Sequence, residues 1–195
     1  MLEGHHLLPL AIDLNQLAHR SVTSLYSNLV TRPTGRAVRM GVESQIAELN
    51  PPAVCLSVLD FSSVRVLDYS CADEIVAKLL LRYQADSRTS EVYLLVRGLQ
   101  EHHHDAIEAV LERHGLLLVV EAEGVYSLLG PTNPAERACW RALVRRGPST
   151  PSAVARDTGL GEPAARSVLA SFTDRRVALS LANEVVCPLS LVVRG

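Results

Sequence analysis

Residues 54–83 run from an apolar stretch through a short polar segment into an amphipathic helix, and this order constrains the fold more than any other feature. Residues 54–59 have the length and branching of a strand that is covered on both faces. Asp60 follows this strand, and Asp68 lies just before the helix. The apolar positions of the helix recur at helical spacing and form one stripe, made of Ala72, Ile75, Val76, Leu79, Leu80 and Tyr83. We therefore predict a buried strand connected to a helix by a polar loop.

The loop reads Asp68-Tyr69-Ser70-Cys71, and Ser70 is the predicted N-cap of the helix. Residues 36–120 resemble the STAS family, the sulphate-transporter and anti-sigma-factor-antagonist fold. In that family a strand ending in Asp leads to an Asp-Ser-Ser-Gly-like helix start, and Tyr69 and Cys71 depart from its usual serine and glycine.

This resemblance implies that Ser70 is a phosphoacceptor and that Asp60, Asp68 and Tyr69 contribute with it to a partner-binding surface. The implied partner is an anti-sigma factor of the histidine-kinase-like ATPase class, which phosphorylation of Ser70 would release. A phosphoserine at a helix start would add about two negative charges to that surface. The alternative is that Ser70 only caps the helix.

The remaining patterns of the first two thirds predict an α/β fold with a mixed sheet and crossover helices. Strands are expected at 91–96, 116–120 and 125–129, and a helix is expected at 102–114 with Gly115 ending it. Upstream, we predict a helix at 14–30, a turn at 33–35, an edge strand at 35–39 and a short helix at 42–49.

Charge divides the chain into two predicted domains, 1–130 and 131–195. The first has 10 Lys or Arg against 16 Asp or Glu, and the second has 9 against 5. Pro131, Asn133 and Pro134 mark the junction. So short a linker is expected to keep the two domains in contact.

Residues 131–195 resemble a winged helix-turn-helix domain, a small α+β fold. Three helical patterns carry the resemblance, at 135–146, at 151–158 after an N-cap at Thr150, and at 162–176. A hairpin of strands 177–181 and 184–187 follows. The resemblance implies that the third helix enters the major groove of double-stranded DNA. The residues implied in DNA contact are Arg166, Ser167, Arg175 and Arg176, with Arg145 and Arg146 at the end of the first helix. A homodimer is expected to compensate for weak contacts at each half-site.

Other chemistries find little support in the sequence. The side chains of His102, His103 and His104 point about 100° apart on a helix, so they do not converge on one metal ion. Glycine-rich phosphate loops and a nucleophile elbow are absent from the sequence, so we expect neither an enzyme nor a cofactor. The four cysteines show no paired spacing and are expected to be reduced, although a thiol at a helix start, such as Cys71, can have a lowered pKa and sense redox state.

No apolar run approaches the roughly 20 residues that span a bilayer, and no signal peptide is evident. The sequence therefore predicts a cytoplasmic, bacterial-type transcription regulator in which a STAS-like domain receives a signal and a winged helix binds DNA. The alternative is an anti-sigma-factor antagonist that acts only through protein contacts, with the winged helix used for dimerisation or docking. A third, remote interpretation is a small-molecule sensor with its ligand near Asp60 and Gly98.

Overall fold

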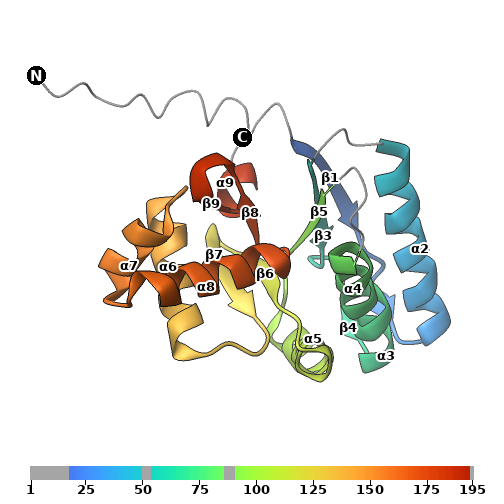
Figure 1. The fold of residues 1–195 in the computed structure, drawn as a ribbon. Coiled ribbons are helices and arrows are strands. Elements are labelled where there is room, and N and C mark those ends of the chain that lie inside the picture. Colours follow the sequence, from blue (N-terminus) through green and yellow to red (C-terminus); the bar gives the residue numbers. More distant parts are fainter. Residues whose placement is uncertain (1–17, 50–53, 86–90, 194–195) are drawn as a thin grey trace, which may run out of the picture.

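The centre of the molecule is a five-stranded mixed sheet with the strand order β1-β3-β5-β6-β7. The computed structural model describes residues 18–49, 54–85 and 91–193 (Figure 1). Neighbouring strands are parallel except for β7, which forms an antiparallel hairpin with β6. The strands are β1 (Ala18–Ser24), β3 (Val54–Asp60), β5 (Glu91–Arg97), β6 (Leu118–Ala122) and β7 (Val125–Leu129). The prediction of a mixed sheet with crossover helices is confirmed.

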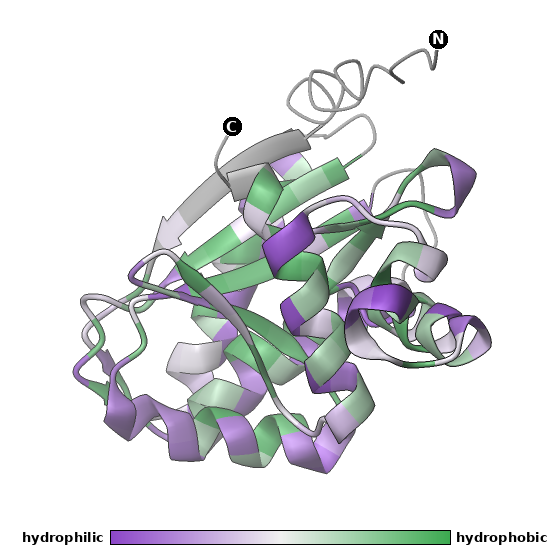
Figure 2. Cartoon of the chain, turned by 90° about the vertical axis from the view of Figure 1, so that its left-hand side faces the viewer, coloured by the Kyte–Doolittle hydropathy of each residue, from purple (hydrophilic) through white to green (hydrophobic). Residues whose placement is uncertain are grey.

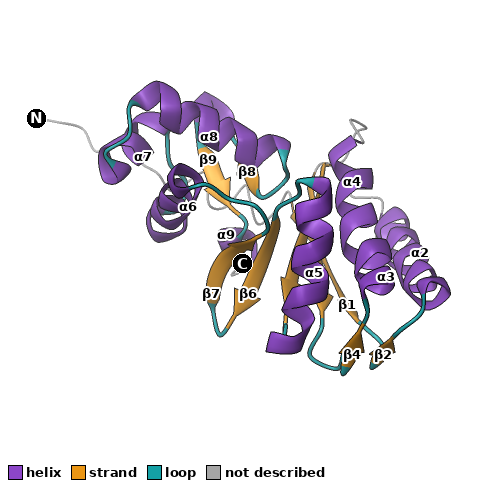
Figure 3. Ribbon diagram, turned by 90° about the horizontal axis from the view of Figure 1, so that it is seen from below, coloured by secondary structure: helices purple, strands orange, loops and turns teal. Residues whose placement is uncertain are grey.

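All crossover helices cover the same face of this sheet (Figure 3). They are α2 (Arg32–Leu49), the continuous turns α3 (Tyr69–Ala72), η1 (Asp73–Ala77) and α4 (Lys78–Ala85), and α5 (Glu101–His114). Right-handed crossovers that always step to the next strand in the same direction place every helix on one side. The apolar stripe predicted for 72–83 is buried throughout, and Gly115 ends α5 in the left-handed conformation as expected.

The predictions for the first 50 residues were largely wrong. The predicted helix at 14–30 is replaced, within the described residues, by β1 and by β2 (Asn28–Leu29), which pairs with β4 (Val66–Leu67); residues 14–17 lie outside the described part. Pairing with β3 along the whole of β1 overrides the local helical spacing. The predicted turn at 33–35 and strand at 35–39 belong to α2, which also contains the helix predicted at 42–49.

Gly35 explains why α2 tolerates a glycine in its first turns. A Cβ atom there would lie 2.9 Å from the Cα atom of Cys71, so only glycine allows α2 to approach α3 this closely. Pro33 is compatible with a helix because it lies in the first turn, where the backbone N–H groups have no helical partner.

The C-terminal unit comprises residues 134–193 and contains three helices, a two-stranded hairpin and a final short helix. Its elements are α6 (Pro134–Arg146), α7 (Pro151–Thr158), α8 (Glu162–Asp174), β8 (Ala178–Ser180), η2 (Ala182–Glu184), β9 (Val186–Pro188) and α9 (Ser190–Val193). Thr150 caps α7 through the backbone N–H of Ala153, and Pro151 is the first residue of that helix, both as predicted. The predicted order of three helices followed by an antiparallel hairpin is present.

This unit covers the sheet face that the crossover helices leave free. Leu56 and Val58 of β3 and Tyr93 and Leu95 of β5 share one buried cluster with residues of α6, α8 and the hairpin. Trp140 of α6 donates from its indole N–H to the backbone oxygen of Tyr126 at 3.1 Å. Apolar strands therefore lie between two helical layers, and Figure 2 shows them as the most hydrophobic part of the cartoon. Residues of both predicted domains, 1–130 and 131–195, therefore contribute to one buried cluster.

Among the helices of the described residues, none has the length and apolar character needed to cross a bilayer.

We predict that the sheet and the C-terminal unit unfold together. Trp140 is the only tryptophan and lies between them, so its fluorescence and the far-ultraviolet circular dichroism should report the same midpoint in urea. Replacing Trp140 by Ala should lower the free energy of unfolding by about 3–5 kcal/mol, measured by circular dichroism. Arg141→Ala, at an exposed position of the same helix, is the control. Two separated transitions in the unaltered chain would contradict the prediction.

Candidate functional site

The helix that begins at Tyr69 is capped by Asp68, and the prediction that Ser70 is the N-cap was wrong. Asp68 accepts the backbone N–H of Cys71 at 2.8 Å. Ser70 lies two residues further on, and its half-buried hydroxyl donates to both carboxylate oxygens of Asp68 at 2.9 and 3.0 Å. Burial opposes ionisation of Asp68, but these bonds outweigh it and lower its pKa. The carboxylate of Asp68 thus occupies the place that a capping serine would take.

The other two residues of the predicted partner surface are each held by an arginine. Asp60, the last residue of β3, receives two hydrogen bonds from the guanidinium of Arg97 at 2.8 and 3.0 Å. Burial opposes ionisation of Asp60, but bonds from Ser62 and Arg97 lower its pKa. The exposed Tyr69 accepts a hydrogen bond from Arg113 of α5 at 3.0 Å. Asp60, Asp68, Tyr69 and Ser70 therefore all lie near the carboxyl end of the sheet, with partners from β5 and α5.

Sequence reasoning missed a charge network beside this helix start. Glu74 is almost completely buried in η1 and forms ion pairs with Arg32 at 3.0 Å, with Arg39 at 3.2 Å and with Lys78. Burial opposes ionisation of Glu74, but the bonds from Lys78, Arg32 and Arg39 lower its pKa. Asp73 bonds Arg32 at 2.8 Å and His114 at 3.3 Å. Only the pair of Glu74 with Lys78 could be predicted from the sequence, because these residues are four apart on one helix. Arg32 and Arg39 belong to α2 and are distant from Glu74 in the sequence.

The thiol of Cys71 does not have the properties of a redox sensor. It is fully buried and donates to the backbone oxygen of Thr31 at 3.0 Å. Burial, reinforced by Asp68, raises the pKa of Cys71 to about 11. The expectation of a lowered pKa for Cys71 was therefore wrong. Because the thiolate is the reactive form of cysteine, a raised pKa lowers the reactivity of this thiol.

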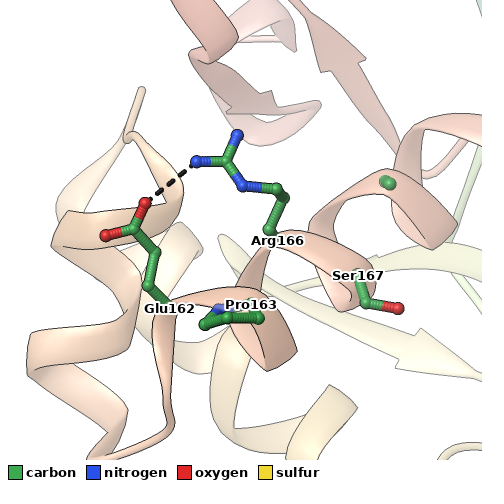
Figure 4. A pocket seen from close by; sticks show the side chains of 5 residues that line it. Glu162, Pro163, Arg166 and Ser167 are labelled. Carbon is green, nitrogen blue, oxygen red and sulfur yellow. Dashed lines mark hydrogen bonds and ion pairs between the residues drawn. The ribbon is translucent and has the colours of Figure 1, made fainter.

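The outer face of α8 carries the predicted residues Arg166 and Ser167, both exposed. With Glu162, Pro163 and Ala170 they line a shallow, mainly apolar hollow (Figure 4). Arg166 forms ion pairs with Glu162 at 2.9 Å and with Glu184 of η2. All three side chains are exposed, so solvent and salt screen both pairs and neither pair fixes the guanidinium in place.

Arg175 and Arg176, at the end of α8, instead connect the C-terminal unit to the rest of the molecule. Arg175 bonds Glu136 at 3.1 Å and the backbone oxygen of Gly115 at 3.0 Å. Arg176 pairs with Glu91 at 3.0 Å and lies over the ring of Tyr93. Their side chains are only 21% and 15% exposed. They lie apart from the outer face of α8 that presents Arg166.

Arg145 and Arg146, at the end of α6, both pair with Asp157 of α7, at 3.0 and 3.1 Å. These pairs are largely solvent-exposed on the arginine side. They join the first two helices of the C-terminal unit while leaving the guanidinium groups at the surface.

The described residues contain no cluster of three histidine, cysteine or acidic side chains that could hold a metal ion. The structure brings Asp60, Asp68, Tyr69 and Ser70 to one end of the sheet, but it does not bring the six predicted DNA-contact residues together. Arg166 and Ser167 lie on the outer face of α8, Arg145 and Arg146 lie beside α7, and Arg175 and Arg176 lie against the rest of the molecule. Comparison with protein-family models, curated proteins and solved structures finds no match to this chain.

We predict that a negative charge at position 70 destabilises the helix start. Ser70→Asp would place a second carboxylate beside Asp68, and like charges at this separation repel. The variant should lose about 1–2 kcal/mol of unfolding free energy, whereas Ser70→Ala should lose about 0.5–1 kcal/mol, one hydrogen bond. Urea unfolding at neutral pH is the measurement, with Ser44→Asp on the exposed side of α2 as control. Equal stability of the Asp and Ala variants would count against the expected repulsion.

A second prediction concerns the pH dependence of stability. Because the pKa of Glu74 is lowered in the folded chain, the Glu74 carboxylate contributes to the free energy of unfolding above its ordinary pKa of 4.5. This contribution is lost as the pH falls through the folded-state pKa. Glu74→Gln should cost about 2 kcal/mol at pH 7 and should flatten the loss of stability below pH 4.5. Urea midpoints measured across this range test the idea, with the exposed Glu48→Gln as control. An unchanged acid slope in Glu74→Gln would refute it.

Proposed function

We propose that the chain is a transcription regulator in which the N-terminal α/β unit receives a signal from a protein partner and the C-terminal unit binds double-stranded DNA through α8. The observation that carries the proposal is the outer face of α8, where Arg166 and Ser167 are exposed and two of the neighbouring side chains, Pro163 and Ala170, are small. Small side chains permit close approach of a helix to base edges, and arginine and serine are both able to bond bases or phosphates.

The arginines of the C-terminal unit differ in how accessible their guanidinium groups are to DNA. Arg166, Arg145 and Arg146 are held by exposed ion pairs, which a phosphate replaces at little cost. Arg175 and Arg176 are part-buried in contacts with Glu136 and Glu91. The proposed interface therefore consists of Arg166 and Ser167 with support from Arg145 and Arg146, and it leaves Arg175 and Arg176 to hold the unit against the sheet.

A STAS-like role for the N-terminal unit belongs to the same proposal. It is supported by the position of four residues near one end of the sheet, namely Asp60, Asp68, Tyr69 and Ser70. Of these, Tyr69 is exposed and Ser70 is half-buried. The proposed partner is a protein of the histidine-kinase-like ATPase class. Transfer of a phosphate to Ser70 would place it against the carboxylate of Asp68 and thereby change the charge and local geometry of this surface.

The second candidate is an antagonist that acts only through protein contacts. Two observations favour it. Arg166 has two acidic neighbours, Glu162 and Glu184, and Arg175 and Arg176 form contacts within the molecule. In this function the C-terminal unit is a structural layer of the sheet and a docking surface.

We predict salt-sensitive DNA binding that depends on Arg166. Fluorescence polarisation with the full chain and random or genomic duplexes should show binding that weakens steeply between about 50 and 200 mM salt. Arg166→Ala should weaken binding by about tenfold, the loss of one good contact. Arg36→Ala, at an exposed position of α2, changes the net charge equally and should bind like the parent.

Two outcomes would favour the antagonist. One is no binding by the full chain at low salt, and the other is equal weakening by the Arg166 and Arg36 variants, which would show a response to net charge alone. Either result would direct the next experiment to capture of the ATPase-class partner on the surface around Asp68.

A further inference from the structure

Exposed apolar side chains gather around the small ribbon formed by β2 and β4. The ribbon is parallel, with Asn28 opposite Val66 and Leu29 opposite Leu67. Side chains alternate along a strand, so the buried Leu29 and Leu67 face the core while Val66 and the residue after β2, Val30, face outward. The exposed large apolar side chains in and beside the ribbon are Tyr26, Val30, Val66 and Tyr69, and we call them the ribbon patch.

Arginines surround the ribbon patch. Arg65 directly precedes Val66 and is exposed, and Arg113 bonds the hydroxyl of Tyr69. Arg32 lies two residues after Val30 with its side chain 48% exposed, but Asp73 and Glu74 already compensate its charge, so Arg65 and Arg113 provide the positive charge of this surface. The nearest carboxylate in sequence, Asp68, is already engaged by Ser70 and Cys71. A surface of this kind fits an apolar side chain that has carboxylates on either side.

The turn between β6 and β7 has this complementary chemistry. Val125 is 67% exposed, the second-highest value among the large apolar side chains of the described residues. It follows Glu121 and Glu123, and Gly124 forms the tight turn with its N–H bonded to Glu121 at 2.7 Å. We call Glu121, Glu123 and Val125 the hairpin tip.

The two surfaces lie along the same end of the sheet. The ribbon follows the carboxyl ends of β1 and β3, and the hairpin tip follows the carboxyl end of β6, which is parallel to them through β5. Figure 3 shows β2, β4 and the β6–β7 turn on one side of the molecule, at opposite ends of the strand order. A two-fold axis perpendicular to the sheet and placed at this end brings the carboxyl ends of the strands of two copies together. It also reverses the lateral order of the strands in the second copy, so the ribbon of one copy faces the hairpin of the other.

We infer that two copies of this chain form a two-fold symmetric dimer in which the hairpin tip of each copy binds the ribbon patch of the other. Val125 packs on Val66 and Tyr69 of the second copy, and Glu123 and Glu121 face Arg65 and Arg113. The contact occurs twice, as a closed two-fold interface requires. This inference is independent of DNA binding, because α8 is not part of the interface. Tyr69 belongs both to the ribbon patch and to the surface proposed for the protein partner, so the dimer and that partner exclude each other at this residue.

Charge reversal across the interface provides the test. Arg65→Glu and Glu123→Lys each place like charges at both contacts of a dimer, and each should weaken the dimer by about tenfold or more. An equimolar mixture of the two variants should dimerise again, because a mixed dimer has one contact in which both charges are reversed and one unaltered contact. Sedimentation velocity of the full chains at about 50 mM salt and from about 1 to 200 μM protein measures the dimer fraction. Arg36→Glu and Glu48→Lys, which are exposed on α2, are the matched controls.

Recovery of the dimer only in the mixture, with the controls like the parent, would support the inference. Circular dichroism of each variant shows that loss of the dimer is not loss of the fold. The inference is overturned if the parent chain stays monomeric over the whole concentration range, or if its dimer resists both reversals. A series of larger species in place of a dimer would also overturn it, because head-to-tail contacts would then not close.

Discussion

The apolar face that β3, β5 and β6 turn away from the crossover helices determines where residues 134–189 lie. Each parallel strand follows its neighbour in the same direction along the sheet, so right-handed crossovers bring α2, α4 and α5 to one side. Leu56, Val58, Tyr93 and Leu95 would otherwise face water, and burying a side chain of this size contributes about 1.5–3 kcal/mol. The C-terminal unit removes that surface from solvent. Its position is therefore a requirement of the sheet and not a loose attachment.

This requirement limits how the two parts can communicate. Gly130 lies between β7 and α6 with φ +110, and a Cβ atom there would lie 2.3 Å from the backbone oxygen of Leu116. Trp140, Arg175 and Arg176 then hold the unit at further points, through Tyr126, Gly115 and Glu91. With a shared core and a close-packed junction, the partner that we propose for the N-terminal unit would act through changes in surface charge and local geometry more readily than through a rotation of one unit against the other.

The sequence predicted those elements whose signals are local. The stripe of residues 72–83, the glycine at 115 and the cap at Thr150 specify their own conformations. The helix predicted over 14–30 failed because β1 is specified by pairing with β3, which local spacing does not report. Ser70 was assigned as the cap since serine is common at that position, whereas Asp68, two residues earlier, accepts the backbone N–H of Cys71.

The candidate sites were harder to predict, because a charged side chain is defined by partners from elsewhere in the chain. Arg175 and Arg176 looked like phosphate contacts until Glu136 and Glu91 were brought beside them by the fold. The buried position of Glu74 likewise depends on Arg32 and Arg39 from α2. The ribbon patch had no signal at all, since β2 and β4 are two residues each and exist only through their mutual pairing.

The distribution of ion pairs also explains why one copy of α8 is a weak candidate for tight DNA binding. Glu162 and Glu184 compete with phosphates for Arg166, and although each exposed pair is weak, together they reduce the gain from a phosphate contact. The predicted excess of positive charge beyond residue 130 is partly consumed inside the molecule by Arg175 and Arg176. Joining two such units converts the second contact into an intramolecular one, and this can raise affinity without any new contact at either half-site. If α8 binds DNA as we propose, its affinity would therefore depend on assembly of two copies more than on the charge of one α8.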